Sequence, residues 1–211
     1  MKPIIFARVA DMKLYKGITE DDRPVNGGAY VKETNYAHEC CNFLPVQLEG
    51  DDEHEYCLGF TQLLGGQNPQ LHIERIVGCE AMKNEAKVND VIVVFCSKPL
   101  NGKTMRVVGF YKHATVFRDY KRCTFSSDDG KEDVQYYCFI AEKKDCVLLP
   151  YGKRFTDGSW FVPTSGKMGS SFGYGHSNIW FAGSNTDNQD EIRYVNKMIE
   201  SIENYSGENM I

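Results

Sequence analysis

The segment His-Glu-Cys-Cys at residues 38–41 contains side chains that commonly bind zinc. Structural zinc sites generally use Cys-x-x-Cys spacing, and no pair among the eight cysteines has it. In an extended segment, the adjacent Cys40 and Cys41 would also point to opposite sides. The sequence therefore predicts neither a bound metal nor a cofactor, and it favours reduced, buried thiols.

A second candidate for chemistry is the pattern of Asp133, Glu142 and Lys144, because a nuclease could use such side chains to hold magnesium and orient water. The pattern is short and common, and the sequence offers no convincing further acid. The chain has no nucleophile elbow and no phosphate-binding glycine loop after a strand. A metal-dependent nuclease is thus the weakest alternative, and a binding module is favoured over an enzyme.

Two segments, residues 27–43 and 159–183, combine glycines with aromatic and small polar side chains. A pocket for a flat polar ring requires this combination, since aromatic faces stack the ring and polar groups bond its edge. We predict Tyr30, Trp160 and Trp180 as aromatic walls, Asn42, Ser177 and Asn178 as edge contacts, and His38 and Tyr111 as secondary contacts. The alternative is that the tryptophans are core residues, and the apolar run around Trp180 favours it there.

Strand-like runs bounded by turn residues recur along the chain, and they predict an α+β, mainly β fold. The dipeptide Asn101-Gly102 favours a tight reversal, so we expect residues 90–96 to pair antiparallel with residues 105–111. Near the end, Ile192, Val195, Ile199 and Ile202 form one apolar stripe, which predicts a packing helix over about 187–205. No linker or repeat divides the chain, so residues 1–211 are interpreted as a single domain.

The net charge of −5 argues against nonspecific coating of nucleic acid, which depends on many phosphate contacts by Lys and Arg. The charge is uneven, because residues 98–122 carry seven basic side chains and only Asp119 as an acid. No apolar run approaches membrane-spanning length, and the first residues do not resemble a secretory signal. We therefore expect a cytoplasmic protein without a membrane partner.

The run from Asn89 to Asp119, together with "HECCNFLPV" and "HSNIWFA", resembles the PUA-like superfamily, which contains the EVE, YTH and ASCH domains. The resemblance is firmest over residues 88–120. It implies a small, twisted, partly closed β-barrel with flanking helices. One departure is that EVE domains often carry an early tryptophan, where this chain offers Phe6.

The resemblance implies a nucleic-acid reader, meaning a domain that holds a modified base of DNA or RNA, flipped or single-stranded, in an aromatic pocket. In bacteria such domains often act with a nuclease effector in antiphage restriction. It also implies that Lys112, Arg118, Lys121 and Arg122 lie near a phosphate-bearing surface. A sensor of a small or nucleotide-derived ligand, with the same pocket, is the main alternative. Steep salt dependence of binding would favour the reader.

Overall fold

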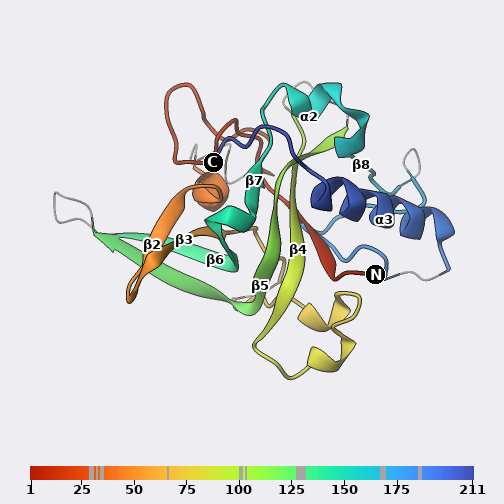
Figure 1. The fold of residues 1–211 in the computed structure, drawn as a ribbon, viewed down its shortest axis with the longest axis horizontal. Helices are drawn as coiled ribbons and strands as arrows, with labels where there is room; N and C mark the ends of the chain where they lie inside the picture. Colours follow the sequence, from red (N-terminus) through yellow and green to blue (C-terminus); the bar gives the residue numbers. More distant parts are fainter. Residues whose placement is uncertain are drawn as a thin grey trace.

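The computed structural model describes residues 1–28, 31, 33, 36–65, 67–99, 102, 104–126, 132–166, 170–184 and 187–211. Its architecture is mainly β, as predicted (Figure 1). The strands are β1 (Ile4–Arg8), β2 (Pro45–Leu48), β3 (Asp51–Gly59), β4 (Lys87–Ser97), β5 (Met105–Ser126), β6 (Glu132–Glu142), β7 (Cys146–Leu148), β8 (Phe161–Val162) and β9 (Ile179–Trp180). The helices are α2 (Lys153–Thr156) and α3 (Gln189–Glu203), with 3-10 turns η1 (His38–Cys41), η2 (Ile73–Arg75), η3 (Glu80–Met82), η4 (Lys143–Asp145) and η5 (Gly158–Trp160).

All of these strands belong to one mixed sheet in the order β2-β3-β6-β5-β4-β1-β9, with β7 and β8 also paired to β5. The pairing of β1 with β4 is parallel, and the other pairs are antiparallel. Within the described residues, no pairing joins the terminal strands β2 and β9, so the strand path is open.

The predicted central hairpin is confirmed, because Val93 pairs with Tyr111 and Phe95 with Gly109 in antiparallel register. Asn101, on which that prediction depended, lies outside the described residues. Gly109 has a structural role of its own. A Cβ there would lie 2.4 Å from the carbonyl oxygen of Val147 and 2.6 Å from the ring of Phe43, so this close approach of β7 requires glycine.

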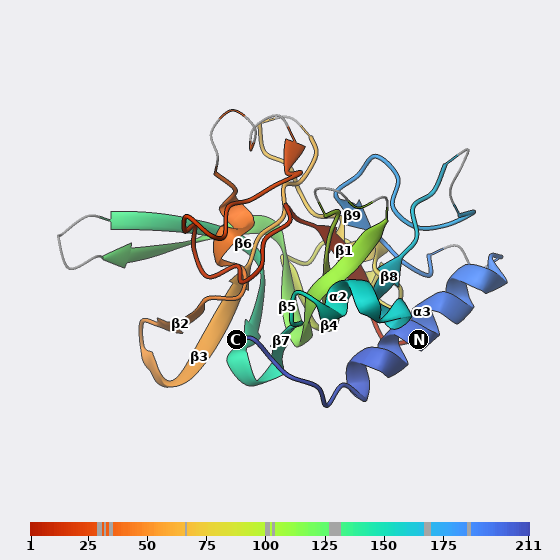
Figure 2. The ribbon, with the colours of Figure 1, turned by 90° about the horizontal axis from the view of Figure 1, so that it is seen from above.

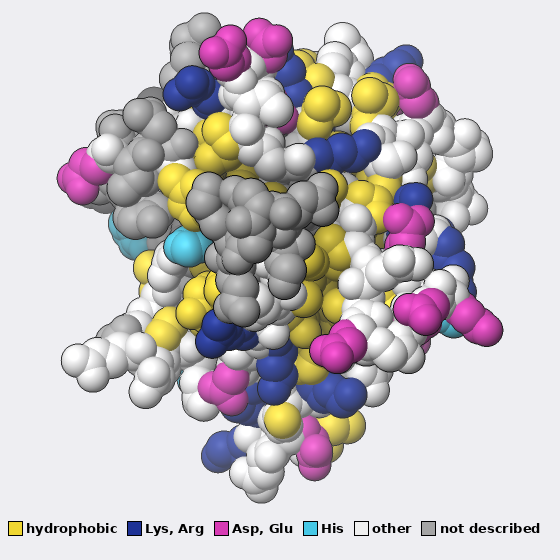
Figure 3. Space-filling view, turned by 90° about the vertical axis from the view of Figure 1, so that its left-hand side faces the viewer, with side chains coloured by type: hydrophobic (Ala, Val, Ile, Leu, Met, Phe, Trp, Pro, Cys, Tyr) yellow, Lys and Arg dark blue, Asp and Glu magenta, His cyan; other side chains and the backbone are white. Residues whose placement is uncertain are grey.

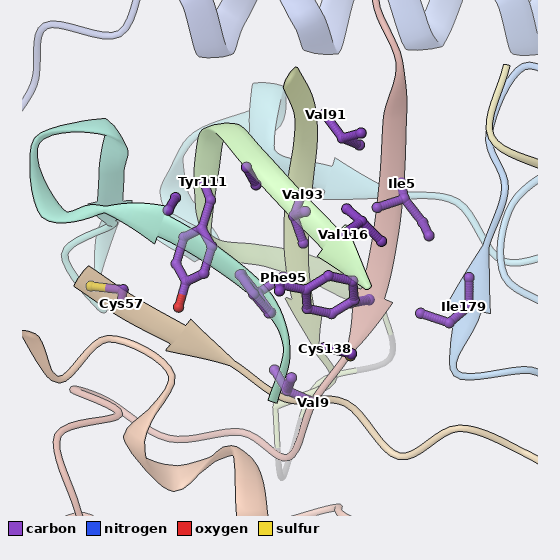
Figure 4. Close-up of a cluster of buried hydrophobic side chains, with 14 of the residues drawn as sticks. Ile5, Val9, Cys57, Val91, Val93, Phe95, Tyr111, Val116, Cys138 and Ile179 are labelled. Carbon is purple, nitrogen blue, oxygen red and sulfur yellow. The ribbon is translucent and has the colours of Figure 1, made fainter. Parts of the chain in front are cut away.

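Strands β1 and β4 are buried on both faces, which explains why they read as nearly continuous apolar runs. Successive side chains of a strand point to opposite faces, so Ile5 and Phe95 enter one core cluster while Phe6 and Val94 enter another. Figure 4 shows part of the first cluster, including Phe95 and Tyr111.

The predicted C-terminal helix is present as α3, which covers the second core cluster. Val195 and Ile202 of the apolar stripe are fully buried, and Met198 lies between them at 2 % exposure. Burial of side chains of this size stabilises a fold by roughly 1.5 to 3 kcal/mol each. The Asn188 side chain caps the helix by accepting a hydrogen bond from the amide of Glu191 at 3.1 Å.

Beyond the sheet, β5 and β6 continue as a two-stranded arm. After a register shift between Val116 and Lys121, residues 121–126 pair only with residues 132–137 among the residues that the structure describes. Figures 1 and 2 both place this arm at the end of the molecule opposite α3. The arm therefore exposes surface that the helix does not cover.

No helix in the described ranges is both long and apolar enough to span a membrane. All eight cysteines are present as free thiols.

Candidate functional site

A pocket of about 290 Å³ lies at the C-terminal end of β1. Its walls come from segments far apart in the sequence: the end of β1, the Gly27-Gly28 pair, the start of η1, the residues after β3 and the residue before β9. Gly28 has a φ of 89°, which explains why glycine is used at this position. The volume is near the lower end of the range for small-ligand sites.

The start of η1 gives the pocket two ionisable side chains, His38 and Glu39. Burial lowers the pKa of His38, which favours the neutral imidazole. Burial raises the pKa of Glu39, although hydrogen bonds from the amides of Ala10 and of Glu39 itself oppose this shift. Glu39 Oε1 accepts from the Ala10 amide at 2.8 Å, so its carboxyl group is held in place.

Arg8 gives the same pocket a cationic side chain in a fixed position. Its guanidinium lies over the Tyr174 ring at 5.0 Å, and its Nη2 donates to the carbonyl oxygen of Gly175 at 3.2 Å. Its buried Nε has no hydrogen-bond partner within the described part of the chain. The pocket thus offers a guanidinium, a carboxyl group and an imidazole as hydrogen-bonding groups.

A group of rings, which we call the aromatic surface, begins in the pocket wall and continues outside it. It consists of Tyr36, His38, Phe60, Tyr120 and Tyr136. The His38 ring lies 5.2 Å from Tyr36, 5.2 Å from Phe60 and 6.3 Å from Tyr136, and Phe60 is stacked on Tyr120 at 5.1 Å. Tyr36 and Tyr136 are 37 % and 42 % exposed.

Figure 3 shows the end of the molecule where the arm projects. Hydrophobic and histidine side chains lie side by side there, with a group of Lys and Arg side chains below them and acidic side chains scattered around. The surface at this end therefore combines exposed apolar area with positive charge.

Among the predicted site residues, the structure brings His38 and Asn178 together in the pocket. The Asn178 amide donates to the carbonyl oxygen of Gln62 at 2.9 Å, and its backbone oxygen accepts from the amide of Arg8 at 2.7 Å. Asn178 therefore joins two walls of the pocket. Tyr30 lies outside the described residues, although Gly28 and Val31 line the pocket on either side of it in the sequence.

Asn42 and Tyr111 are fully buried and do not line this pocket. Asn42 exchanges two hydrogen bonds of 2.9 Å with the backbone of Phe60, and the Tyr111 hydroxyl donates to the carbonyl oxygen of Asn42. Their role in the structure is to fix the backbone that carries Phe60. They support the pocket wall from behind.

Both tryptophans lie in the second core cluster. For Trp180, this agrees with the alternative interpretation of the sequence, in which it is a core residue. Trp160 is 4 % exposed and lies 6.1 Å from the Phe110 ring, and Trp180 is 8 % exposed and lies 4.6 Å from the Phe6 ring. Ser177 and Trp180 line a separate depression of about 350 Å³. The structure therefore does not gather the predicted aromatic walls into one pocket.

The predicted phosphate contacts divide into two kinds. Arg118 donates to Glu74 Oε2 at 2.8 Å and to the carbonyl oxygens of Glu85, Met82 and Lys83 at 2.8 to 3.1 Å, so its guanidinium is already occupied. Lys121 and Arg122 are exposed at the base of the arm, and Lys112 is partly buried on β5. Lys121 and Arg122 are the better placed of the predicted cations.

Of the residues considered for a nuclease, Glu142 and Lys144 form an ion pair of 2.5 Å. Within the described residues, no three His, Cys, Asp or Glu side chains are grouped as a metal would require. The structure does not describe the side chain of Asp133.

Sequence reasoning missed Arg8, Phe60 and Tyr136 as members of the site. Arg8 ends an apolar strand and Phe60 follows one. A charged or aromatic residue at the end of a strand is therefore the sequence feature that could have identified both as site residues. Tyr136 carried no such signal, because it lies inside a strand among other aromatic residues.

No protein-family model matches the chain, and neither a curated protein nor a solved structure matches it. The structure by itself defines a mainly β protein with a ligand-sized pocket bordered by exposed aromatic rings.

Proposed function

We propose that this protein is a nucleic-acid reader of the PUA-like kind, which binds a modified nucleobase, flipped or single-stranded, in the pocket at the end of β1. The observation that carries the proposal is the continuity of the pocket with the aromatic surface through His38. A base is a flat polar ring, and a reader needs both a stacking face and hydrogen-bonding groups at the ring edge.

In this proposal, the rings of His38 and Phe60 provide the apolar wall. Glu39 and Arg8 provide groups of opposite polarity for the edge of the base. A buried carboxyl group with a raised pKa is able to donate or to accept a hydrogen bond, depending on its protonation state. Lys121 and Arg122 supply contacts for phosphates outside the pocket.

The biological role that fits such a reader is antiphage restriction in the cytoplasm, with modified DNA or RNA as ligand and a nuclease as effector. This role follows from the resemblance to PUA-like domains. The open strand order is compatible with a partly closed barrel whose closing contacts are made by loops and side chains rather than by strand pairing.

A second candidate is a sensor of a small or nucleotide-derived ligand in the same pocket. The observation that favours it is that Arg118, one of the predicted phosphate contacts, is consumed by internal hydrogen bonds in a chain with a net charge of −5. A protein with fewer free cations gains less from counterion release on a polymer.

The test is binding of short DNA and RNA oligonucleotides, with modified and unmodified bases, at two salt concentrations. The reader is supported if one modified base is preferred and affinity falls steeply with salt. Binding of the free nucleoside with little salt dependence supports the sensor, and absence of binding to every probe contradicts the reader.

The variant His38→Ala should weaken binding roughly tenfold without a matching loss of thermal stability, because a stacking face is lost. His54→Ala is the matched control, since His54 is an exposed histidine of β3 that does not line the pocket. Equal effects of the two substitutions would contradict the placement of the site.

A further inference from the structure

We propose that the aromatic surface outside the pocket is a second subsite, which stacks the bases next to the one in the pocket, so that the ligand is a single strand of several nucleotides. This inference rests on the proposed function and adds to it the form of the polymer.

The geometry places the two subsites in direct contact. The His38 ring belongs to the pocket wall and also lies within 5.2 Å of Tyr36 and 6.3 Å of Tyr136. Both rings meet the His38 ring edge to face, at 90° and 83° between planes. The fold leaves both tyrosines more than a third exposed. Splayed bases that follow a base in the pocket would therefore find ring faces within one nucleotide's reach.

The arm adds positive charge at the same place. Arg122 is directly opposite Tyr136 in the β5–β6 ladder, so the two side chains emerge on the same face. Arg122 is exposed and has no ion pair within the residues that the structure describes. Lys121, the preceding residue, pairs with Tyr137 and lies on the opposite face of the arm, with its Nζ 5.3 Å from the Phe117 ring. A guanidinium beside an exposed ring is the pairing that a strand of stacked bases linked by phosphates requires.

A single strand fits this surface better than a duplex. The exposed rings need free base faces, and in a duplex both faces of each base are covered by its neighbours. On the face that carries Tyr136, Arg122 supplies positive charge, and a single cation suits a short strand rather than the long line of phosphates on a duplex. A protein partner would not need the base pocket at all.

The experiment compares a mononucleotide with a pentanucleotide that carries the same base at its centre, using 5-methylcytosine, 5-hydroxymethylcytosine and N6-methyladenine as probes. Wild-type protein should bind the pentanucleotide of its preferred base more tightly than the mononucleotide. Tyr136→Ala and Tyr36→Ala should weaken pentanucleotide binding roughly 5- to 100-fold and leave mononucleotide binding unchanged, because stacking is lost only outside the pocket.

Several controls keep the result interpretable. Tyr136→Phe should bind like wild type, since it keeps the ring. Phe161→Ala removes an aromatic side chain of similar exposure, 38 %, from β8, outside the aromatic surface, and should have no effect on binding. Arg122→Ala should reduce the salt slope of pentanucleotide binding by roughly 1. Melting temperatures establish that every variant is folded.

The outcomes separate this inference from the function on which it rests. If wild type binds mononucleotide and pentanucleotide equally, or if a duplex with the same base binds better than the single strand, the second subsite is wrong while the pocket stands. The subsite is also wrong if Tyr136→Ala weakens both ligands equally. If wild type binds none of the probes in either form, the proposed function fails as well.

Discussion

The protein contains two gatherings of aromatic side chains that differ in how they are covered. Trp160, Tyr174 and Trp180 of the Gly-rich segment 159–183 lie in the second core cluster beneath α3. The aromatic surface lies at the opposite end, where Tyr36 and Tyr136 stay exposed. The first group is conspicuous in the sequence and is used for packing. The second is dispersed in the sequence and is available for binding.

The difference follows from the position of each group relative to α3. Trp160 precedes β8 and Trp180 lies in β9, and both belong to the core cluster that α3 covers, whereas Phe161 of β8 remains 38 % exposed. In contrast, β5 and β6 extend past the end of the sheet, at the end of the molecule opposite α3. Aromatic content alone therefore does not distinguish the two groups, whereas the exposure of Tyr36 and Tyr136 does.

The largest expected effect is in the covered group. Trp160→Ala should lower the free energy of unfolding by about 3 to 5 kcal/mol, because it leaves a large cavity against Phe110 and Tyr205. Denaturant unfolding measures this loss, and nucleotide affinity of the remaining folded protein should be unchanged. A fall in affinity with stability intact would mean that Trp160 contacts the ligand, and the comparison would break.

A smaller effect distinguishes Arg118 from Arg122, two of the arginines of β5. Arg118→Ala should lower the free energy of unfolding by about 2 to 3 kcal/mol, because a charged hydrogen-bonding group is lost and its partners are left unsatisfied. Arg122→Ala, at an exposed position, should change stability by less than about 0.5 kcal/mol. Parallel urea titrations test this difference, and equal losses would contradict it.

The cost of Arg118→Ala should also depend on pH. Burial acts to raise the pKa of Glu74, but hydrogen bonds from its own amide, Arg118 and His72 outweigh this and lower it to about 2. A carboxyl group whose pKa is lowered in the folded protein stabilises the fold when the pH is above its ordinary pKa. This contribution is lost as the pH falls toward the lowered pKa. The difference in stability between wild type and Arg118→Ala should therefore shrink between about pH 5 and pH 3.

In the pocket, the expected effect on binding exceeds that on stability. His38→Ala should raise the dissociation constant about tenfold while the free energy of unfolding changes by about 1 kcal/mol or less, since His38 is only partly buried. Titration of the preferred oligonucleotide and a thermal melt measure the two quantities. A melt that falls as far as that of Trp160→Ala would place His38 with the core residues.

The smallest effect concerns Glu39. Burial raises the pKa of Glu39 in the folded protein. The group therefore contributes its whole stabilisation when the pH is below the ordinary pKa of a glutamate, and this contribution is lost as the pH rises through the raised pKa. Glu39→Gln keeps the acceptor for the Ala10 amide and removes the buried charge. The variant should have a higher melting temperature than wild type at pH 8 and nearly the same melting temperature at pH 4. The gain in the free energy of unfolding at pH 8 should be about 1 kcal/mol or less. Glu53→Gln, at an exposed position, should show no such trend.

Local pattern predicted several elements because the interactions that form them are local. The apolar stripe of α3 and the antiparallel pairing of β4 with β5 depend on periodicity and on a nearby reversal, which neighbouring residues specify. His38 and Asn178 were predicted as site residues, and both line the pocket.

The sequence by itself determined the mainly β class, the C-terminal helix and the polar-aromatic character of residues 27–43. Only the tertiary structure decided which rings are covered and which remain exposed. The His38 wall joins Phe60 after β3 and Tyr136 in β6, and contacts across such separations depend on strand register and on where the sheet ends. Trp160 and Tyr136 are both aromatic residues in or beside a strand, but Trp160 lies in the core cluster that α3 covers, whereas Tyr136 contacts the His38 ring and remains 42 % exposed.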